Sequence, residues 1–266
     1  MKAYVEGLGV WAAGLEGWTA CRDVLAGNRA YEPAPLALPP SPLLPANERR
    51  RTVATVRLAL QVGSEAFAHA GRDPSATATV FTSSGGDGET LHGILDALDS
   101  AELDVSPMRF HNSVHNAPAG YWTIATHSRE PSTSLCAFDA SFSAGLLDAV
   151  AQATFDDRAV ALIAYDLPYP EPLHSVRPIG STFAVALVLT PKPTPASFGR
   201  LMLSLGEEMP TPTKMTDSAL ETLRRGNPAA RSLPLLLALA RGDHADLVLD
   251  YVSSNRLAIA VAPPPW

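Results

Sequence analysis

Short apolar runs and longer amphipathic stretches alternate along most of the chain. Strands are predicted where the runs are short, apolar and rich in β-branched residues, at 3–14, 77–83, 132–138, 159–165 and 183–189. Helices are predicted where apolar residues recur every three or four positions, at 18–26, 48–70, 89–98, 117–126 and 143–154. This alternation of strands and helices favours a layered α/β fold.

Three further regions have a different pattern. Residues 32–45 contain six prolines and should form an extended surface segment, and 106–116 should be irregular. After a second proline-rich stretch, helices are predicted at 217–225 and 232–241, and strand-like runs at 245–252 and 257–262 form a hairpin. We therefore predict a domain over 1–192 and a C-terminal appendage of helices and a β-hairpin over 193–266.

The composition is that of a chain with a large core and few charges. Of the 266 residues, 46% are apolar and only 18% are charged, while 24 are proline. A sparsely charged surface is typical of a protein that buries part of it against a partner. A proline-rich domain that stands alone explains the composition equally well.

The net charge of −7 argues against nucleic-acid binding, which requires clustered basic residues. The N-terminus lacks a signal-peptide pattern, and no apolar run is long enough for a membrane span. Cys21 and Cys136 lie far apart and match no metal or disulfide spacing. We expect a cytoplasmic protein without a cofactor or metal.

Two stretches contain residues that could bind a metal or take part in catalysis. His111 and His115 are four apart, but Pro118 indicates that they lie in a loop before a helix, which disfavours metal binding. Ser141 lies at a turn between a strand and a helix, where it is either the helix N-cap or a nucleophile activated by a histidine. The G-x-S-x-G elbow of serine hydrolases is absent around it.

Five stretches, taken in order, resemble the N-terminal half of β-ketoacyl synthases: the first strand and helix, a glycine turn, an asparagine-containing loop, the nucleophile elbow and the closing strand. They are Val5-Glu6-Gly7-Leu8-Gly9-Val10 with Trp18 and Leu25-Ala26-Gly27, Ser83-Ser84-Gly85-Gly86, 114–120, Ala140-Ser141-Phe142-Ser143-Ala144-Gly145, and Ile179-Gly180-Ser181 with 183–189. The resemblance covers roughly residues 1–192 and implies a thiolase-like layered fold.

Two departures from that family indicate a subunit without condensing chemistry. Ser141 follows Ala140 where the family has the cysteine that carries the acyl thioester, and Cys136 is expected to be a small buried residue inside the preceding strand. The family draws two histidines and a lysine from a second half, for which the residues after Lys192 are too few. A ketosynthase-like chain of this kind resembles the chain-length factors of type II polyketide and aryl polyene pathways.

The resemblance implies a heterodimer with an active β-ketoacyl synthase and a role in bounding the length of the acyl or polyene chain. The strand at 132–138 would form the shared edge, with interface residues Ser132, Thr133, Ser134, Leu135, Cys136 and Asn116. Met108, Phe110 and Phe142 would face the growing chain, and Arg109 would pair at the rim; alternatively, Met108 and Phe110 pack the local core. The acyl carrier protein, itself acidic, would dock mainly on the partner.

Two other hypotheses remain open from the sequence. The first is a stand-alone acyl-thioester hydrolase or acyltransferase that uses Ser141 with His115 or His111, and it requires the Ser141 hydroxyl within hydrogen-bond reach of an imidazole. The second is a homodimeric scaffold without a ligand. The heterodimer instead predicts an apolar, exposed edge strand and a chain that behaves poorly when it is isolated.

Overall fold

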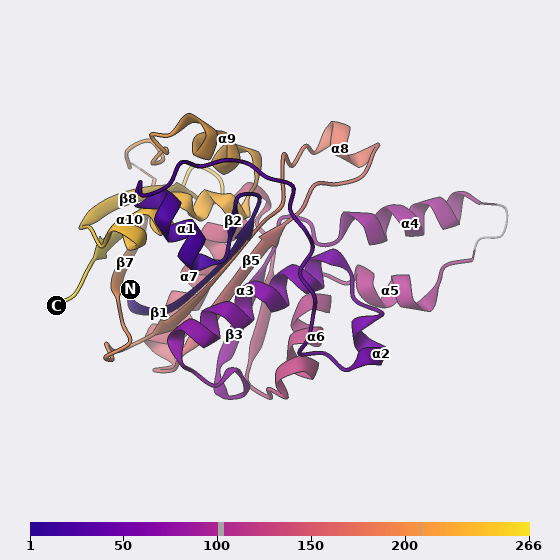
Figure 1. Cartoon of the computed structure of the whole chain (residues 1–266), viewed down its shortest axis with the longest axis horizontal. Helices are drawn as coiled ribbons and strands as arrows, with labels where there is room; N and C mark the ends of the chain where they lie inside the picture. Colours follow the sequence, from indigo (N-terminus) through magenta and orange to yellow (C-terminus); the bar gives the residue numbers. More distant parts are fainter. Residues whose placement is uncertain (101–103, 208) are drawn as a thin grey trace.

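The computed structural model describes residues 1–100, 104–207 and 209–266, and in these ranges a nine-stranded sheet carries helices on both faces (Figure 1). The strands are β1 (Lys2–Ala12), β2 (Leu15–Glu16), β3 (Ala78–Thr82), β4 (Ser132–Leu135), β5 (Val160–Asp166), β6 (Phe183–Thr190), β7 (Gly199–Gly206), β8 (Ala245–Asp250) and β9 (Arg256–Ala262). Their order is β4-β3-β5-β6-β1-β7-β9-β8, and β2 pairs only with β1. The sheet is parallel at β4-β3-β5 and antiparallel beyond β5.

Helices cover both faces of the central strands because those strands are apolar on both sides. Every residue of β5 and β6 is buried. One face holds α3 (Ala54–Ala70) and α6 (Ala117–Thr126), and the other holds α1 (Trp18–Leu25), α7 (Ser141–Phe155) and α10 (Leu233–Arg241). The layered fold expected from the sequence is therefore confirmed.

Two glycines of β1 let α3 approach the sheet closely. A Cβ atom built on Gly7 would lie 2.0 Å from the carbonyl oxygen of Ala66, and one on Gly9 would lie 2.1 Å from that of Val62. A side chain at either position would force helix and strand apart. The glycines therefore set the separation between β1 and α3.

The proline-rich segment 32–45 has no regular structure, as predicted, and it leads to the short helix α2 (Ala46–Arg49). Leu44, only 2% exposed, packs into the same core as α3. The helix predicted over 48–70 is interrupted before α3, since Val53 has an extended backbone and the Thr52 hydroxyl donates to the Arg49 carbonyl.

Helices α4 (Gly88–Asp99) and α5 (Pro107–Ser113) project from the body as an arm (Figure 1). The prediction that 106–116 is irregular was wrong over α5, which begins with Pro107 in its first turn. The Arg109 guanidinium joins the two helices by donating to the Gly93 carbonyl at 2.7 Å.

The residues after β6 lengthen the same sheet. The sequence analysis missed β7, which pairs with β1 on one side and β9 on the other. The hairpin β8–β9 is confirmed, as are α10 and α9 (Ser218–Gly226). The boundary at 192/193 stays a prediction. Across the described ranges, no helix combines the length and the apolar character needed to cross a bilayer.

Candidate functional site

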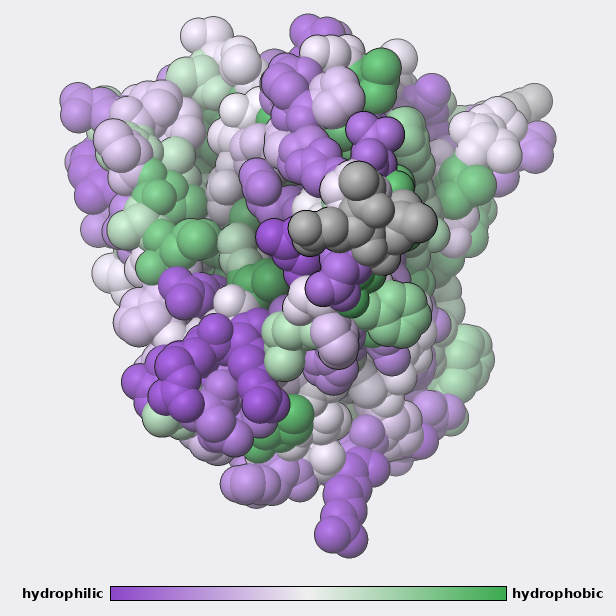
Figure 2. All heavy atoms as spheres, turned by 90° about the vertical axis from the view of Figure 1, so that its right-hand side faces the viewer, coloured by the Kyte–Doolittle hydropathy of each residue, from purple (hydrophilic) through white to green (hydrophobic). Residues whose placement is uncertain are grey.

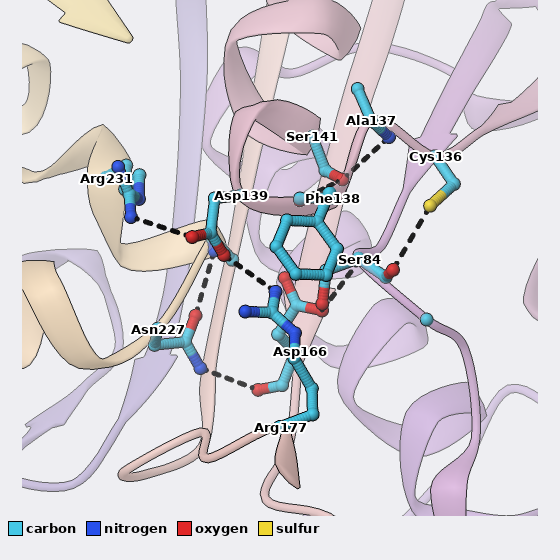
Figure 3. A network of polar contacts seen from close by, with 12 residues as sticks. Ser84, Cys136, Ala137, Phe138, Asp139, Ser141, Asp166, Arg177, Asn227 and Arg231 are labelled. Carbon is cyan, nitrogen blue, oxygen red and sulfur yellow. Dashed lines mark hydrogen bonds and ion pairs between the residues drawn. The ribbon is translucent and has the colours of Figure 1, made fainter. Parts of the chain in front are cut away.

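Ser141 is the first residue of α7, where the chain turns from β4 into the helix (Figure 3). Its side chain is 1% exposed, and its Oγ donates to the Phe138 carbonyl at 2.7 Å and accepts from the Ala137 N–H at 3.0 Å. The N-cap position predicted for Ser141 belongs to Ala140, one residue earlier. The hydroxyl is therefore engaged, as donor and as acceptor, within its own turn.

Among the described residues, neither candidate histidine forms a hydrogen bond with Ser141, whose Oγ bonds to Ala137 and Phe138. In the described part of the chain, His115 hydrogen-bonds through Nε2 to the Ser83 carbonyl at 3.2 Å, and His111 packs edge-on against the ring of Tyr121, 6.0 Å away. No cluster of three His, Cys, Asp or Glu side chains suited to a metal occurs among the described residues. Among the described residues, neither imidazole is therefore positioned to act as a base toward this serine.

The expectation that Cys136 is a small buried residue inside the strand was wrong. It is exposed rather than buried, because β4 ends at Leu135 and the chain then turns toward the short 3-10 turn Phe138–Ala140. Its thiol donates to the carbonyl of Ser84 at 3.1 Å (Figure 3). Phe138, with a positive φ of 52°, completes the change of direction.

A buried carboxylate beside the turn was missed by the sequence analysis. Asp166, at the end of β5, accepts from the Ser84 N–H at 2.8 Å, the Ser84 hydroxyl at 2.7 Å and the Ser83 hydroxyl at 3.2 Å. Burial raises the pKa of Asp166 to about 6, although these hydrogen bonds oppose the rise. The signal in the sequence was an acidic residue closing an otherwise apolar strand.

Ion pairs tie the turn to the C-terminal part of the chain (Figure 3). Asp139 pairs with Arg177 at 2.7 Å and with Arg231 at 3.3 Å, and Arg231 also reaches Asp250 of β8 at 2.9 Å. The guanidinium of Arg177 lies 3.7 Å from the centroid of the Phe138 ring. Residues far apart in the sequence therefore hold the turn in place.

The predicted interface residues lie together at one end of the sheet. Among the described strands, β4 pairs only with β3; it consists of Ser132, Thr133, Ser134 and Leu135, and Cys136 follows directly. Asn116 lines a groove of about 490 Å³ beside this strand. The full lining is His115, Asn116, Ala119, Gly120, Thr123, Ser132 and Ser134.

The three residues predicted to face an acyl chain do not form one surface. Phe110, on α5, is 67% exposed, and Met108 on the same helix is partly exposed. Phe142 is 1% exposed and packs in the core that α7 shares with the sheet. Phe110 therefore does not pack the local core, and the role of Phe142 at a tunnel stays a prediction.

Solved structures similar to this fold cover nearly the whole chain. A ketosynthase (ApeO) in complex with its chain length factor (ApeC) from Xenorhabdus doucetiae matches with a TM-score of 0.72 and 22% identity, over 98% of this chain and 99% of that chain. The ishigamide ketosynthase/chain length factor matches with a TM-score of 0.74 and 10% identity, over 100% of both chains. A β-ketoacyl synthase from Burkholderia phymatum matches with a TM-score of 0.71 and 11% identity, over 99% of this chain and 100% of that chain. Identities this low establish the fold alone.

No curated protein matches the sequence. The model of the β-ketoacyl synthase N-terminal domain matches residues 22–245, which include β3 to β6, the turn at Ser141 and α7. The match extends over most of the chain and agrees with the order of the elements. The chain therefore belongs to the family of the β-ketoacyl synthase N-terminal domain.

Proposed function

We propose that this chain is a chain-length factor: a non-condensing subunit that pairs with an active, cysteine-bearing β-ketoacyl synthase and bounds the length of its product. The observation that carries the proposal is the state of Ser141. We take the turn at Ser141 as the counterpart of the family's nucleophile turn, and its serine hydroxyl is hydrogen-bonded to the backbone of Ala137 and Phe138.

Condensation requires a nucleophile that attacks a thioester, and the hydrogen bonds of Ser141 support the proposal that this turn does not supply one. A serine hydroxyl reacts only when a base removes its proton. The Ser141 hydroxyl instead donates to the Phe138 carbonyl, with 2.7 Å between the two oxygens. The thiol of Cys136 points likewise to the Ser84 carbonyl. The turn is thus maintained as a structural element.

The end of the sheet at β4 supports pairing with another subunit. Ser132, Thr133 and Ser134 are small and uncharged, so a second strand could approach their backbone without steric or electrostatic obstruction. Apolar side chains are also exposed at Val114, which follows α5, and at Ile124 of α6, which are 46% and 42% exposed. The groove beside Ser132 and Ser134 could receive side chains from the partner.

The arm supplies further apolar surface. Leu91, Leu95 and Leu98 of α4 follow helical spacing and are 44%, 55% and 50% exposed, and Phe110 of α5 is the most exposed apolar residue of the arm. Figure 2, viewed from the arm's side of the molecule, shows green hydrophobic side chains interspersed with polar ones on this face. We propose that Phe110 and Met108 enter the partner's acyl tunnel, while Arg109 stays at the rim, paired with Gly93.

Two of the similar structures are described as ketosynthases with a chain length factor, which agrees with this proposal. By the same proposal, the product is an acyl or polyene chain, the complex works in the cytoplasm, and the acyl carrier protein docks mainly on the partner. The net charge of −7 disfavours docking of an acidic carrier on this chain.

Co-purification with a cysteine-bearing ketosynthase from the same genome tests the pairing, and a malonyl-carrier decarboxylation assay tests the missing chemistry. We expect a stable heterodimer, and we expect the isolated chain to decarboxylate no faster than its Ser141→Ala variant. A homodimer that excludes the ketosynthase would favour the scaffold hypothesis. Turnover above the Ser141→Ala control would overturn the non-condensing assignment.

A further inference from the structure

A groove on the α1 side of the molecule, with no role in the pairing proposed above, lies where distant parts of the chain meet. It is formed by the start of α1, the end of α3, the segment before β7, the end of α10 and the residues after β9, and its volume is about 520 Å³. Cavities that bind small molecules commonly have this size. Its apolar wall includes Trp18, Phe198 and Leu239.

The groove is also basic, although the chain as a whole is acidic. Arg22, His69 and Arg241 line it, and none of the described residues that line it carries a carboxylate. Arg241 donates from Nε to the Leu25 carbonyl at 3.3 Å, which leaves its terminal amino groups without a protein partner in the described ranges. The Arg22 side chain has no hydrogen bond or ion pair within those ranges either. Two guanidinium groups are thus available to an anion.

His69 is held in a defined state between these arginines and the aromatic wall. Its Nδ1 accepts from the Leu8 N–H at 3.1 Å, so the proton of the neutral ring is on Nε2, and the ring stacks on Phe198 with centroids 5.2 Å apart. Partial burial lowers the pKa of His69, and the charge of Arg22 lowers it further. The carboxylate of Glu65, one turn earlier on α3, does not line the groove and accepts from the N–H groups of Trp18 and Val10.

We propose that this groove binds an amphiphilic anion: a carboxylate or phosphate held by Arg22 and Arg241, joined to an apolar group that packs against Trp18 and Phe198. Guanidinium groups bind both kinds of anion through charge-assisted hydrogen bonds. The aromatic wall adds affinity only for a ligand with apolar surface.

Calorimetric titration with four probes tests the ligand class. Octanoate and octyl phosphate combine charge and chain, inorganic phosphate has only the charge, and octanol has only the chain. We expect the two amphiphilic anions to bind at least about ten-fold more tightly than either phosphate or octanol. The tighter of the two identifies the headgroup. Equal binding of octanol and octanoate, or of phosphate and octyl phosphate, would overturn the proposal.

The affinities of arginine variants and the NMR titration of the His69 imidazole test the same site independently. Arg22→Ala and Arg241→Ala should each weaken octanoate or octyl phosphate binding about ten-fold. The matched control is Arg225→Ala, which removes an exposed arginine of α9 outside the groove and should leave binding unchanged. The NMR titration of His69 should move to higher pH when the anion is bound, because a nearby negative charge favours the imidazolium. An unmoved titration, or equal losses in Arg225→Ala, would contradict the site.

Discussion

The two edge strands of the sheet, β8 and β4, differ in how their outer backbone is protected. At β8, a neighbouring segment covers the outer strand: the Thr213 N–H donates to the Val248 carbonyl at 2.8 Å, and the Val248 N–H donates to the Thr213 hydroxyl at 2.9 Å. Charged residues add to this protection, since Asp246 and Asp250 lie on the strand and Asp250 pairs with Arg231. Edge strands of proteins that avoid association are commonly covered and charged in this way.

At β4, the residues that the structure describes provide neither form of protection. In the described part of the chain, the backbone of Ser132–Leu135 is bonded only to β3, and the strand has no charged side chain. One molecule therefore contains a blocked edge and an open edge. The difference agrees with the proposal that the β4 edge pairs with a partner, since only the β8 edge is covered and charged.

The largest expected effect follows from placing a charge on the open edge. Ser134→Lys should abolish co-purification with the ketosynthase, because an unpaired ammonium buried at the interface costs several kcal/mol, which corresponds to a more than hundred-fold loss of affinity. Its matched control is Asp246→Lys on β8, which introduces the same residue at the protected edge and should leave pairing unchanged. Unaltered co-purification of Ser134→Lys would remove β4 from the interface.

The second prediction concerns Asp166, which should dominate the pH dependence of folding stability in the acid range. Because the pKa of Asp166 is raised to about 6, the folded state binds its proton more tightly than the unfolded chain does. The contribution of Asp166 to stability is thus present at low pH and falls as pH rises toward 6, by about 3 kcal/mol. Denaturant titrations from pH 4 to 7 should show this fall in the wild type and its absence in Asp166→Asn.

The Ser84→Ala variant gives a second test of the pH dependence of stability. It removes the 2.7 Å hydrogen bond that supports the ionised carboxylate, so the fall in stability should continue to higher pH than in the wild type. Parallel pH profiles for wild type and Asp166→Asn would show that Asp166 does not titrate in this range.

The protection of β8 can be reduced by one hydrogen bond. Thr213→Ala removes the hydroxyl that accepts from Val248, and the loss should cost about 1 kcal/mol in the free energy of unfolding. The uncovered N–H should also promote self-association, which sedimentation at increasing concentration would detect. Thr222→Ala is the control, since the Thr222 hydroxyl donates to the Ser218 carbonyl within α9. Unchanged stability and sedimentation would show that Thr213 does not guard the edge.

Most regular elements could be predicted because their apolar residues repeat with a local period, as in α6 and the β8–β9 hairpin. The prediction missed β7, although Leu201 and Leu203 alternate with exposed residues there, since prolines precede the strand. It missed α5 because its large apolar residues do not form a helical stripe facing a core. The support around Ser141 was beyond the sequence altogether. Asp139 and Arg231 are 92 residues apart, and only the folded chain brings them together.

The smallest expected effect on stability accompanies a change in product. Phe110 is 67% exposed on the arm, so Phe110→Ala should alter the free energy of unfolding of the isolated chain by less than about 0.5 kcal/mol. If Phe110 closes the partner's tunnel, its removal opens space in which each added CH₂ gains about 0.8 kcal/mol, and the product should lengthen. Phe155→Ala is the matched control, because Phe155 is 76% exposed at the end of α7, away from the arm. Mass spectrometry of carrier-bound chains from the reconstituted pair should show longer products for Phe110→Ala but not for Phe155→Ala. Met108→Ala should act in the same direction as Phe110→Ala. An unchanged distribution from intact complexes would show that the arm does not measure the chain.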